Sequence, residues 1–322
     1  HWTTFNPEIS VVDVHPNLKV SNTERGLFFQ VDLDHYVPAR ATIRLANDNT
    51  FMSYSLAQIQ PNTFLTERLS HQVVNNMKYV DVELTHEGLS RETRFHYLLQ
   101  AVGPGQEYHV ISNDRNCSIE TKPGTFYQTN VIWIDKVKEF APVTDGFHLS
   151  PVYQIQPFDL AIKSKFRVGI RYDRDLVEHS NLGIYYYEGK EEKWVYTPTE
   201  NNRRKQILTA EMEQMDAVTV IQDLDSPQIK NTFPGNSGRY HIQDVNRIEI
   251  EVDDSISGIE SEEASFDLLL NDNPVHPAYQ PLKKTVSYNF DHPLKEGQHK
   301  IDFKVRDRMG NESAGTIYFS VY

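Results

Sequence analysis

The stretch Arg247-Ile-Glu-Ile-Glu-Val252 decides the fold class, because apolar and charged side chains alternate through it with a period of two. Successive side chains of a β-strand point to opposite faces, so this alternation is typical of a strand with one face in a core and one in solvent. Five such strands within about 100 residues predict a small Greek-key β-sandwich. The other four lie at residues 265–270, 285–290, 299–305 and 316–321.

Similar strand-like stretches occur through the rest of the chain. Gly103-Pro-Gly105 separates a first group from a second, and Asp223-Leu-Asp-Ser-Pro227 separates the second from the third, since the residue before a proline is held extended. Helical periodicity is limited to one turn at most, near residues 176–179. The strand-like stretches lie at residues 27–33, 41–45, 50–56, 78–84 and 94–99, and then at 108–111, 118–120, 130–134, 166–172, 182–187, 194–196 and 218–221.

These breaks predict an all-β protein of tandem immunoglobulin-like β-sandwich domains, because about 100 residues is the usual size of such a unit. The predicted domains are residues 1–103 with an N-terminal extension, residues 104–226 and residues 227–322. The chain opens at His1 without a methionine. We therefore expect it to be a mature or excised segment of a longer protein.

Composition and charge exclude several classes of partner. The net charge of −13 argues against nucleic acid and against an anionic membrane surface, which both require clustered Lys and Arg. No run of about 18 apolar residues exists, so no transmembrane segment is expected. Cys117 is the single cysteine, which rules out an intrachain disulfide, and its alternating context predicts a half-buried strand position. Secreted animal sandwiches usually carry more cysteines, so we expect an extracytoplasmic bacterial protein, in the periplasm or at the cell surface.

The third group of strands resembles bacterial Ig-like domains of secreted and surface proteins over about 90 residues. The resemblance is carried by Asp254-Ser-Ile-Ser-Gly-Ile259, Leu294-Lys-Glu-Gly-Gln-His-Lys-Ile301 and Val305-Arg-Asp-Arg-Met-Gly-Asn311. It implies a sandwich fold and says little about function. In the last motif we expect Asp307 to accept backbone N–H bonds across a turn in which Gly310 and Asn311 tolerate a positive φ.

The middle group looks like the sandwich that precedes such a domain in the non-catalytic C-terminal part of lysostaphin-like zinc peptidases. The matching stretches are Ser150–Pro157, 184–187, 194–196 and 218–227. That family holds zinc with a His-x-x-x-Asp pair and a His-x-His pair, and neither spacing occurs among the 13 histidines. Gly235-Asn-Ser-Gly238 does not match the Gly-x-Ser-x-Gly nucleophile elbow and is interpreted as a loop. No catalytic residue is predicted, and an enzymatic activity is not expected of this chain.

Acidic residues suggest one candidate metal site. Asp223 and Asp225 lie at the junction of the second and third groups, and Asp253 and Asp254 lie on a loop that could come close. Calcium takes about six to eight oxygen ligands, often from several carboxylates, so a calcium ion could stiffen this junction. The alternative is an ordinary set of exposed turn residues.

Aromatic residues suggest one candidate carbohydrate-binding site. Tyr185, Tyr186 and Tyr187 are consecutive, and Trp194 follows in the next strand. Together they could form a platform for sugar rings. The alternative, which we favour, is that one face of these strands fills the sandwich core, because consecutive strand residues point to opposite faces.

The sequence therefore predicts a non-catalytic structural or interaction region of an extracytoplasmic bacterial envelope or surface protein, with a protein or a cell-wall glycan as the partner. The alternatives are the accessory domains of a lysostaphin-like peptidoglycan hydrolase whose catalytic domain lies outside this chain, or a carbohydrate-binding module.

Overall fold

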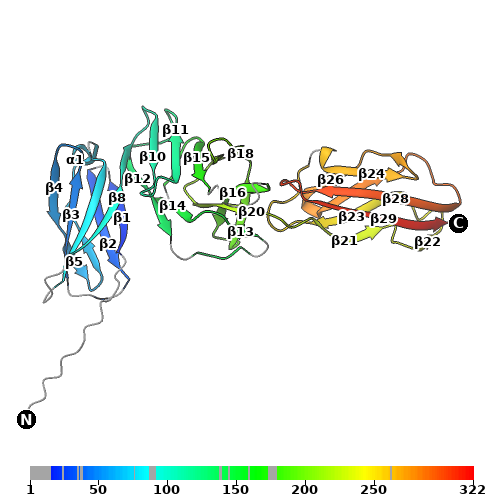
Figure 1. The fold of residues 1–322 in the computed structure, drawn as a ribbon, viewed down its shortest axis with the longest axis horizontal. Helices are drawn as coiled ribbons and strands as arrows, with labels where there is room; N and C mark the ends of the chain where they lie inside the picture. Colours follow the sequence, from blue (N-terminus) through cyan, green and yellow to red (C-terminus); the bar gives the residue numbers. More distant parts are fainter. Residues whose placement is uncertain are drawn as a thin grey trace, which may run out of the picture. The chain divides into compact units, whose positions relative to one another are not determined.

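The computed structural model describes residues 16–322, apart from residues 24, 35, 37–38, 76, 87–91, 138–139, 144–145, 159, 173–179 and 262. In this part the chain is nearly all β-strand, with one short helix, α1 (His71–Asn75), and two short 3-10 turns (Figure 1). The all-β prediction is confirmed. The N-terminal extension and the helical turn expected near residues 176–179 lie outside the described residues.

The chain forms two compact units. The first comprises residues 1–136, 154–168 and 212–215, and the second comprises residues 137–153, 169–211 and 216–322. Strands β14 (Val152–Gln156) and β15 (Phe166–Arg171) have residues in both. The division at residues 103 and 226 stays a prediction.

The first unit contains a sandwich of two antiparallel sheets that share one apolar core. Leu18 and Phe29 enter this core from one sheet and Ile43 and Val82 from the other, and all four side chains are at most 1% exposed. One sheet has the order β1-β2-β6-β5 (Pro16–Thr23, Gly26–Leu33, Thr63–Leu65, Ala57–Gln60), and the other has the order β4-β3-β7-β8 (Phe51–Ser55, Ala39–Ala46, Tyr79–His86, Glu92–Leu98).

Four more strands of the first unit pair in two antiparallel sets. Cys117 begins one of them and is buried rather than half-buried, and the burial raises the pKa of its thiol. Such a thiol is a packing residue and not a nucleophile. The pairs are β9 (Gln100–Val102) with β12 (Asn130–Val137), and β10 (Tyr108–Ile111) with β11 (Cys117–Thr121).

The second unit begins with an antiparallel set in which β16 lies between β17 and β20. The short β13 pairs with β20, and β18 pairs with β19. β16 is therefore a central strand, and its residues Ile184 and Tyr185 are 0% exposed. The bounds are β13 (Phe147–His148), β16 (Leu182–Glu188), β17 (Lys193–Thr197), β18 (Thr199–Asn202), β19 (Ile207–Met212) and β20 (Ala217–Gln222).

The second unit ends in a sandwich that confirms the five strands expected from the alternation. Ile250 and Val286 of one sheet and Ile301 and Phe319 of the other share its core. One sheet has the order β21-β23-β27-β26 (Gln228–Phe233, Arg247–Asp253, Thr285–Asn289, Ala278–Gln280). The other has the order β22-β29-β28-β24-β25 (Gly238–Tyr240, Glu312–Val321, Gly297–Arg306, Phe266–Leu270, Asn273–Pro274). The architecture is that of tandem immunoglobulin-like β-sandwiches.

None of the helices in the described part of the chain is long and apolar enough to cross a lipid bilayer.

One carboxyl of the first unit is held in an apolar setting. Asp135, on β12, accepts a hydrogen bond from the indole Nε1 of the buried Trp133 at 2.9 Å. Burial raises the pKa of Asp135 to about 6, and the indole bond opposes only part of that rise.

This raised pKa predicts a pH dependence of folding. Between about pH 4 and 6 the folded state holds the Asp135 proton more tightly than the unfolded state, so the free energy of unfolding falls as pH rises through that window. Asp135→Asn keeps an acceptor for Trp133 and removes the charge. We expect it to remove this fall and to raise stability at pH 7.5 by about 2 to 3 kcal/mol, measured by urea unfolding. The exposed Asp48→Asn is the control, and parallel pH profiles for wild type and Asp135→Asn would contradict the assignment.

Candidate functional site

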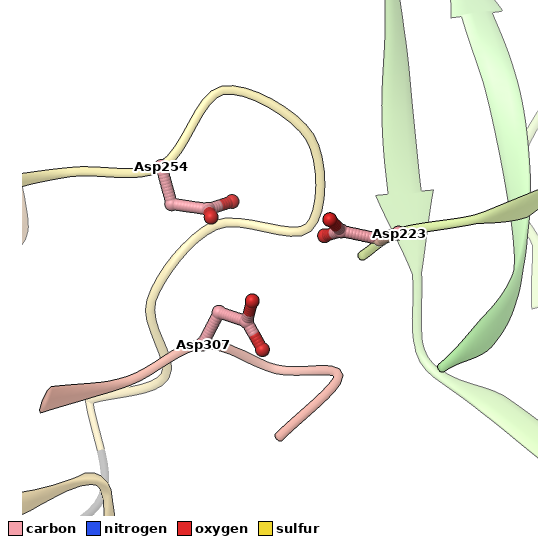
Figure 2. A group of neighbouring side chains, drawn as sticks. All are labelled: Asp223, Asp254 and Asp307. Carbon is pink, nitrogen blue, oxygen red and sulfur yellow. The ribbon is translucent and has the colours of Figure 1, made fainter. Parts of the chain in front are cut away.

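Three carboxylates of the second unit meet at the ends of three strands. Asp223 follows β20, Asp254 follows β23 and Asp307 follows β28. One oxygen of each lies within 4.8 Å of an oxygen of the other two, and Figure 2 shows the three carboxyl groups turned toward one another. We call this group the aspartate cluster.

Each carboxylate fixes the backbone that follows its own strand. Asp254 Oδ1 accepts the N–H of Gly258 at 2.6 Å, and Asp307 Oδ1 accepts those of Met309 at 2.8 Å and Asn311 at 2.9 Å. Asp223 Oδ1 likewise accepts the N–H of residue 225 at 3.1 Å. Short acidic side chains favour such turns because they replace a backbone acceptor. The turn expected at Asp307 is therefore confirmed.

Asp223 and Asp307 are buried and Asp254 is half-buried, and the cluster carries no compensating cation among the described residues. Asp223 is 0% and Asp307 5% exposed, and none of the three carboxylates forms an ion pair with a described Lys, Arg or His. Burial raises the pKa of all three carboxyls, and that of Asp307 reaches about 6. The charge of Asp223 also contributes to the rise at Asp254 and Asp307, because like charges disfavour each other's ionised form.

Two buried oxygens near the cluster form no hydrogen bond among the described residues, although the hydroxyl and the backbone N–H of Ser257 lie close enough to Asp223 to lower its pKa. The two oxygens are Asp223 Oδ2 and the hydroxyl of Tyr185, whose side chain is 0% exposed. The Tyr185 ring leans over Gly183, where an added Cβ would lie 3.0 Å from it, and so toward the end of β16 that pairs with β20 at Gln222. Burial, followed by the charge of Asp223, raises the pKa of this phenol. Its hydroxyl is therefore part of the cluster's surroundings.

An apolar contact docks the C-terminal sandwich beside the cluster. Ile256, two residues after Asp254, packs on the group formed by Val152, Tyr185, Trp194, Ala217 and Ile221. The approach is close, because a Cβ added at Gly146 would lie 3.2 Å from Ile256 Cδ1 and 2.9 Å from the carbonyl oxygen of Gln222. The loop that carried the Ig-like resemblance is thus an interface element.

Hydrogen bonds also hold the junction, by which we mean the contact of the C-terminal sandwich with β16 and β20. Asn311 Nδ2 donates to the Asp223 carbonyl at 3.1 Å and to Asp307 Oδ2 at 2.8 Å, while Asn311 Oδ1 accepts from Asn181 Nδ2. The Asp223 N–H donates to the Asn181 carbonyl at 3.0 Å. Ser313 Oγ donates to the carbonyl of Pro227. Gly310 has the expected positive φ of 91°, whereas Asn311 is not among the described residues with positive φ and acts through its side chain.

The candidate metal ligands are partly rearranged relative to the sequence-based prediction. Asp223 and Asp254 come together as expected. Asp225 is exposed and Asp253 forms an ion pair with Lys284, so neither belongs to the cluster. Asp307 takes their place, although the sequence indicated only a turn residue there. The available signal was that all three aspartates directly follow a strand.

Two of the four residues of the candidate sugar platform are buried and two are half-buried. Tyr185 is 0% and Trp194 7% exposed, and Trp194 Nε1 donates to the Ala141 carbonyl at 3.1 Å. Tyr187 packs edge-on against Phe140 and Trp194, with ring centroids 4.8 and 5.3 Å away, and Tyr186 is half-buried. Burial removes Tyr185 and Trp194 from a binding surface, because a sugar ring must reach the face of an aromatic ring.

Comparison with known proteins gives fold-level similarity only. No family model and no curated protein matches the chain. CopC from Methylosinus trichosporium OB3b aligns with 30% of this chain and 92% of its own at 14% identity, with a TM-score of 0.24. A three-Ig structure of titin aligns with 96% of this chain and 97% of its own at 8% identity, with a TM-score of 0.20. The extracellular domain of a hybrid two-component system from B. thetaiotaomicron aligns with 95% of this chain and 44% of its own at 8% identity, with a TM-score of 0.23. These values carry no argument about function, and none of the three supports the lysostaphin-like resemblance.

The docking contact predicts a specific effect of truncating Ile256. Ile256→Ala removes about three methyl-sized groups from the apolar contact and should lower the free energy of unfolding by about 1 to 3 kcal/mol. It should also expose residues 223–227, measured as faster cleavage there in limited proteolysis. Ile229→Ala is the matched control, because Ile229 is also half-buried but packs within the C-terminal sandwich. Equal cleavage rates in the two variants would contradict a docking role for Ile256.

Proposed function

We propose that the chain is a non-catalytic structural region of an extracytoplasmic bacterial envelope or surface protein, and that its second unit holds the C-terminal sandwich in a fixed orientation on β16 and β20. The observation that supports this most directly is the bonding of the linker. Residues 223–227 are bonded at one end to Asn181 and at both ends to the C-terminal sandwich, through Asn311 and Ser313.

A linker held in this way differs from a flexible tether. A flexible linker is solvated and samples many conformations, so it transmits no orientation. Here Asp223 and Pro227 are buried, and Ile256 adds apolar contact beside them. Ordering each backbone residue costs about 1 to 2 kcal/mol of conformational entropy, which these contacts must offset. The arrangement supports a spacer that orients its end.

The edge strands of the C-terminal sandwich favour a spacer role over assembly with a partner that adds a strand to a sheet. An open, regular edge strand is a template for another chain. The edge strands β22, β25 and β26 have 3, 2 and 3 residues, and β21 has a register shift between Ile229 and Asn231. We therefore place the contact with a protein or cell-wall glycan on side-chain surfaces and not on a sheet edge.

A distance measurement between two spin labels tests this proposal. Cys117 is buried, so labels attach to cysteines introduced by Glu200→Cys and Glu296→Cys, two exposed positions of the second unit. A fixed junction predicts a single narrow distance distribution by pulsed electron spin resonance, and a broad or multiple distribution overturns the proposal.

The same spin-labelled chain tests whether Asn311 holds the junction. Asn311→Ala removes the bonds to the Asp223 carbonyl and to Asp307 and should broaden the distribution. Asn231→Ala changes an exposed asparagine of β21 whose side chain, among the described residues, accepts from the neighbouring Thr232 N–H, and it should leave the distribution unchanged. Identical narrow distributions in both variants would show that Asn311 does not hold the junction.

A further inference from the structure

We propose that Asp223, Asp254 and Asp307 bind one calcium ion. This goes beyond the proposed spacer function, because a spacer of this fold does not require a bound metal ion. The junction and the metal site can be tested separately, since Asn311 and Ser313 bond the carbonyls of Asp223 and Pro227 and not the oxygens proposed to bind the ion.

The spacing of the carboxylate oxygens fits one shared ion. Calcium binds oxygen at about 2.3 to 2.6 Å, so two ligands of the same ion are separated by at most about 5 Å. The oxygens of the three aspartates lie within 4.8 Å of one another. One oxygen of each of Asp223 and Asp254 stays outside the turn bonds described above, and Figure 2 shows their carboxyl groups facing the common centre.

The charge of the cluster requires a cation or protons. Burial raises the pKa of each of the three carboxyls, and the charge of Asp223 adds to the rise at Asp254 and Asp307, so the ionised cluster is costly without a cation. The basic residues on the surrounding elements are engaged elsewhere. Lys284 pairs with Asp253, and Arg308 pairs with Glu260 at 3.2 Å. A divalent ion would compensate two of the three negative charges at once.

The two oxygens without a hydrogen bond are a second reason to expect a ligand, separate from the clustering of three aspartates. A buried polar atom without a hydrogen bond costs about 1 to 3 kcal/mol, so such atoms are rare in folded proteins. Asp223 Oδ2 is one and Tyr185 Oη is another, and the charges of the three aspartates act on the Tyr185 phenol. A bound ion would give Asp223 Oδ2 its missing partner. A water molecule bound to that ion could form the hydrogen bond that the Tyr185 hydroxyl lacks.

The donor set favours calcium over other common metals. All candidate ligands are oxygens, whereas zinc prefers sulfur and nitrogen. Magnesium requires near-ideal octahedral geometry at about 2.0 to 2.1 Å and retains several waters. Three protein carboxylates on three different loops suit the longer bonds and variable coordination number of calcium.

Isothermal titration of the full chain with calcium chloride, after removal of divalent ions by a chelator, tests the proposal. We expect one site per chain, with a dissociation constant of roughly 0.1 to 1 mM or tighter, the range of extracellular calcium modules. Magnesium chloride should bind at least tenfold more weakly. Wild-type protein that gives no saturable binding up to about 10 mM calcium, ten times the weakest expected dissociation constant, overturns the proposal.

Asp223→Asn is the informative variant, because the amide keeps the Oδ1 acceptor for the residue 225 N–H and replaces only the partnerless oxygen. We expect it to weaken calcium binding at least tenfold and to abolish the rise in melting temperature that calcium gives the wild type. Asp225→Asn and Asp253→Asn are matched controls next to the cluster and should bind like wild type. Equal weakening by these controls would show that calcium binds to diffuse surface charge, which overturns the assignment.

Discussion

Three strands of the second unit end side by side, and each is followed by an aspartate whose side chain binds the backbone of its own turn. This shared end is the constraint on which the junction depends. Asp223 and Asp254 each commit one carboxylate oxygen to the turn, whereas Asp307 uses both, the second accepting from Asn311 Nδ2. The C-terminal sandwich cannot shift relative to β20 without moving Asp254 and Asp307 away from Asp223.

Opposing forces act at this point. Apolar packing of Ile256 on Tyr185 and Ile221, together with the bonds of Asn311, brings the strand ends together. The three carboxylates repel one another, and burial increases that repulsion because little water remains to screen it. The polar atoms of the junction are therefore hydrogen-bonded, with the exception of Asp223 Oδ2 in the aspartate cluster and the nearby Tyr185 hydroxyl. The proposed calcium ion would remove this repulsion, because all three carboxylates would be attracted to it.

The aromatic residues of β16 and β17 connect the core to this junction. Gly183 has no Cβ, so the rings of Tyr185 and Tyr196 approach its backbone, where an added Cβ would lie 3.0 and 2.8 Å from them. Tyr185 thereby fills the core with its ring, while its hydroxyl lies close enough to the aspartates for their charges to raise its pKa. Arg308, from the turn after β28, lies over the Tyr196 ring with 5.9 Å from its guanidinium carbon to the ring centroid. The candidate sugar platform is thus a packing layer behind the junction.

The sequence by itself determined the all-β class, the five strands of the C-terminal sandwich and the turn at Asp307, because alternation and turn chemistry are local properties of a few consecutive residues. It also indicated that Asp223 and Asp254 could come close to each other, which the structure confirms. Only the tertiary structure decided that Asp307 joins them, that Asp225 and Asp253 do not, and that Tyr185 and Trp194 are buried. These outcomes depend on which strand ends meet and which face of a strand is covered, and both are set by contacts between residues far apart in the chain.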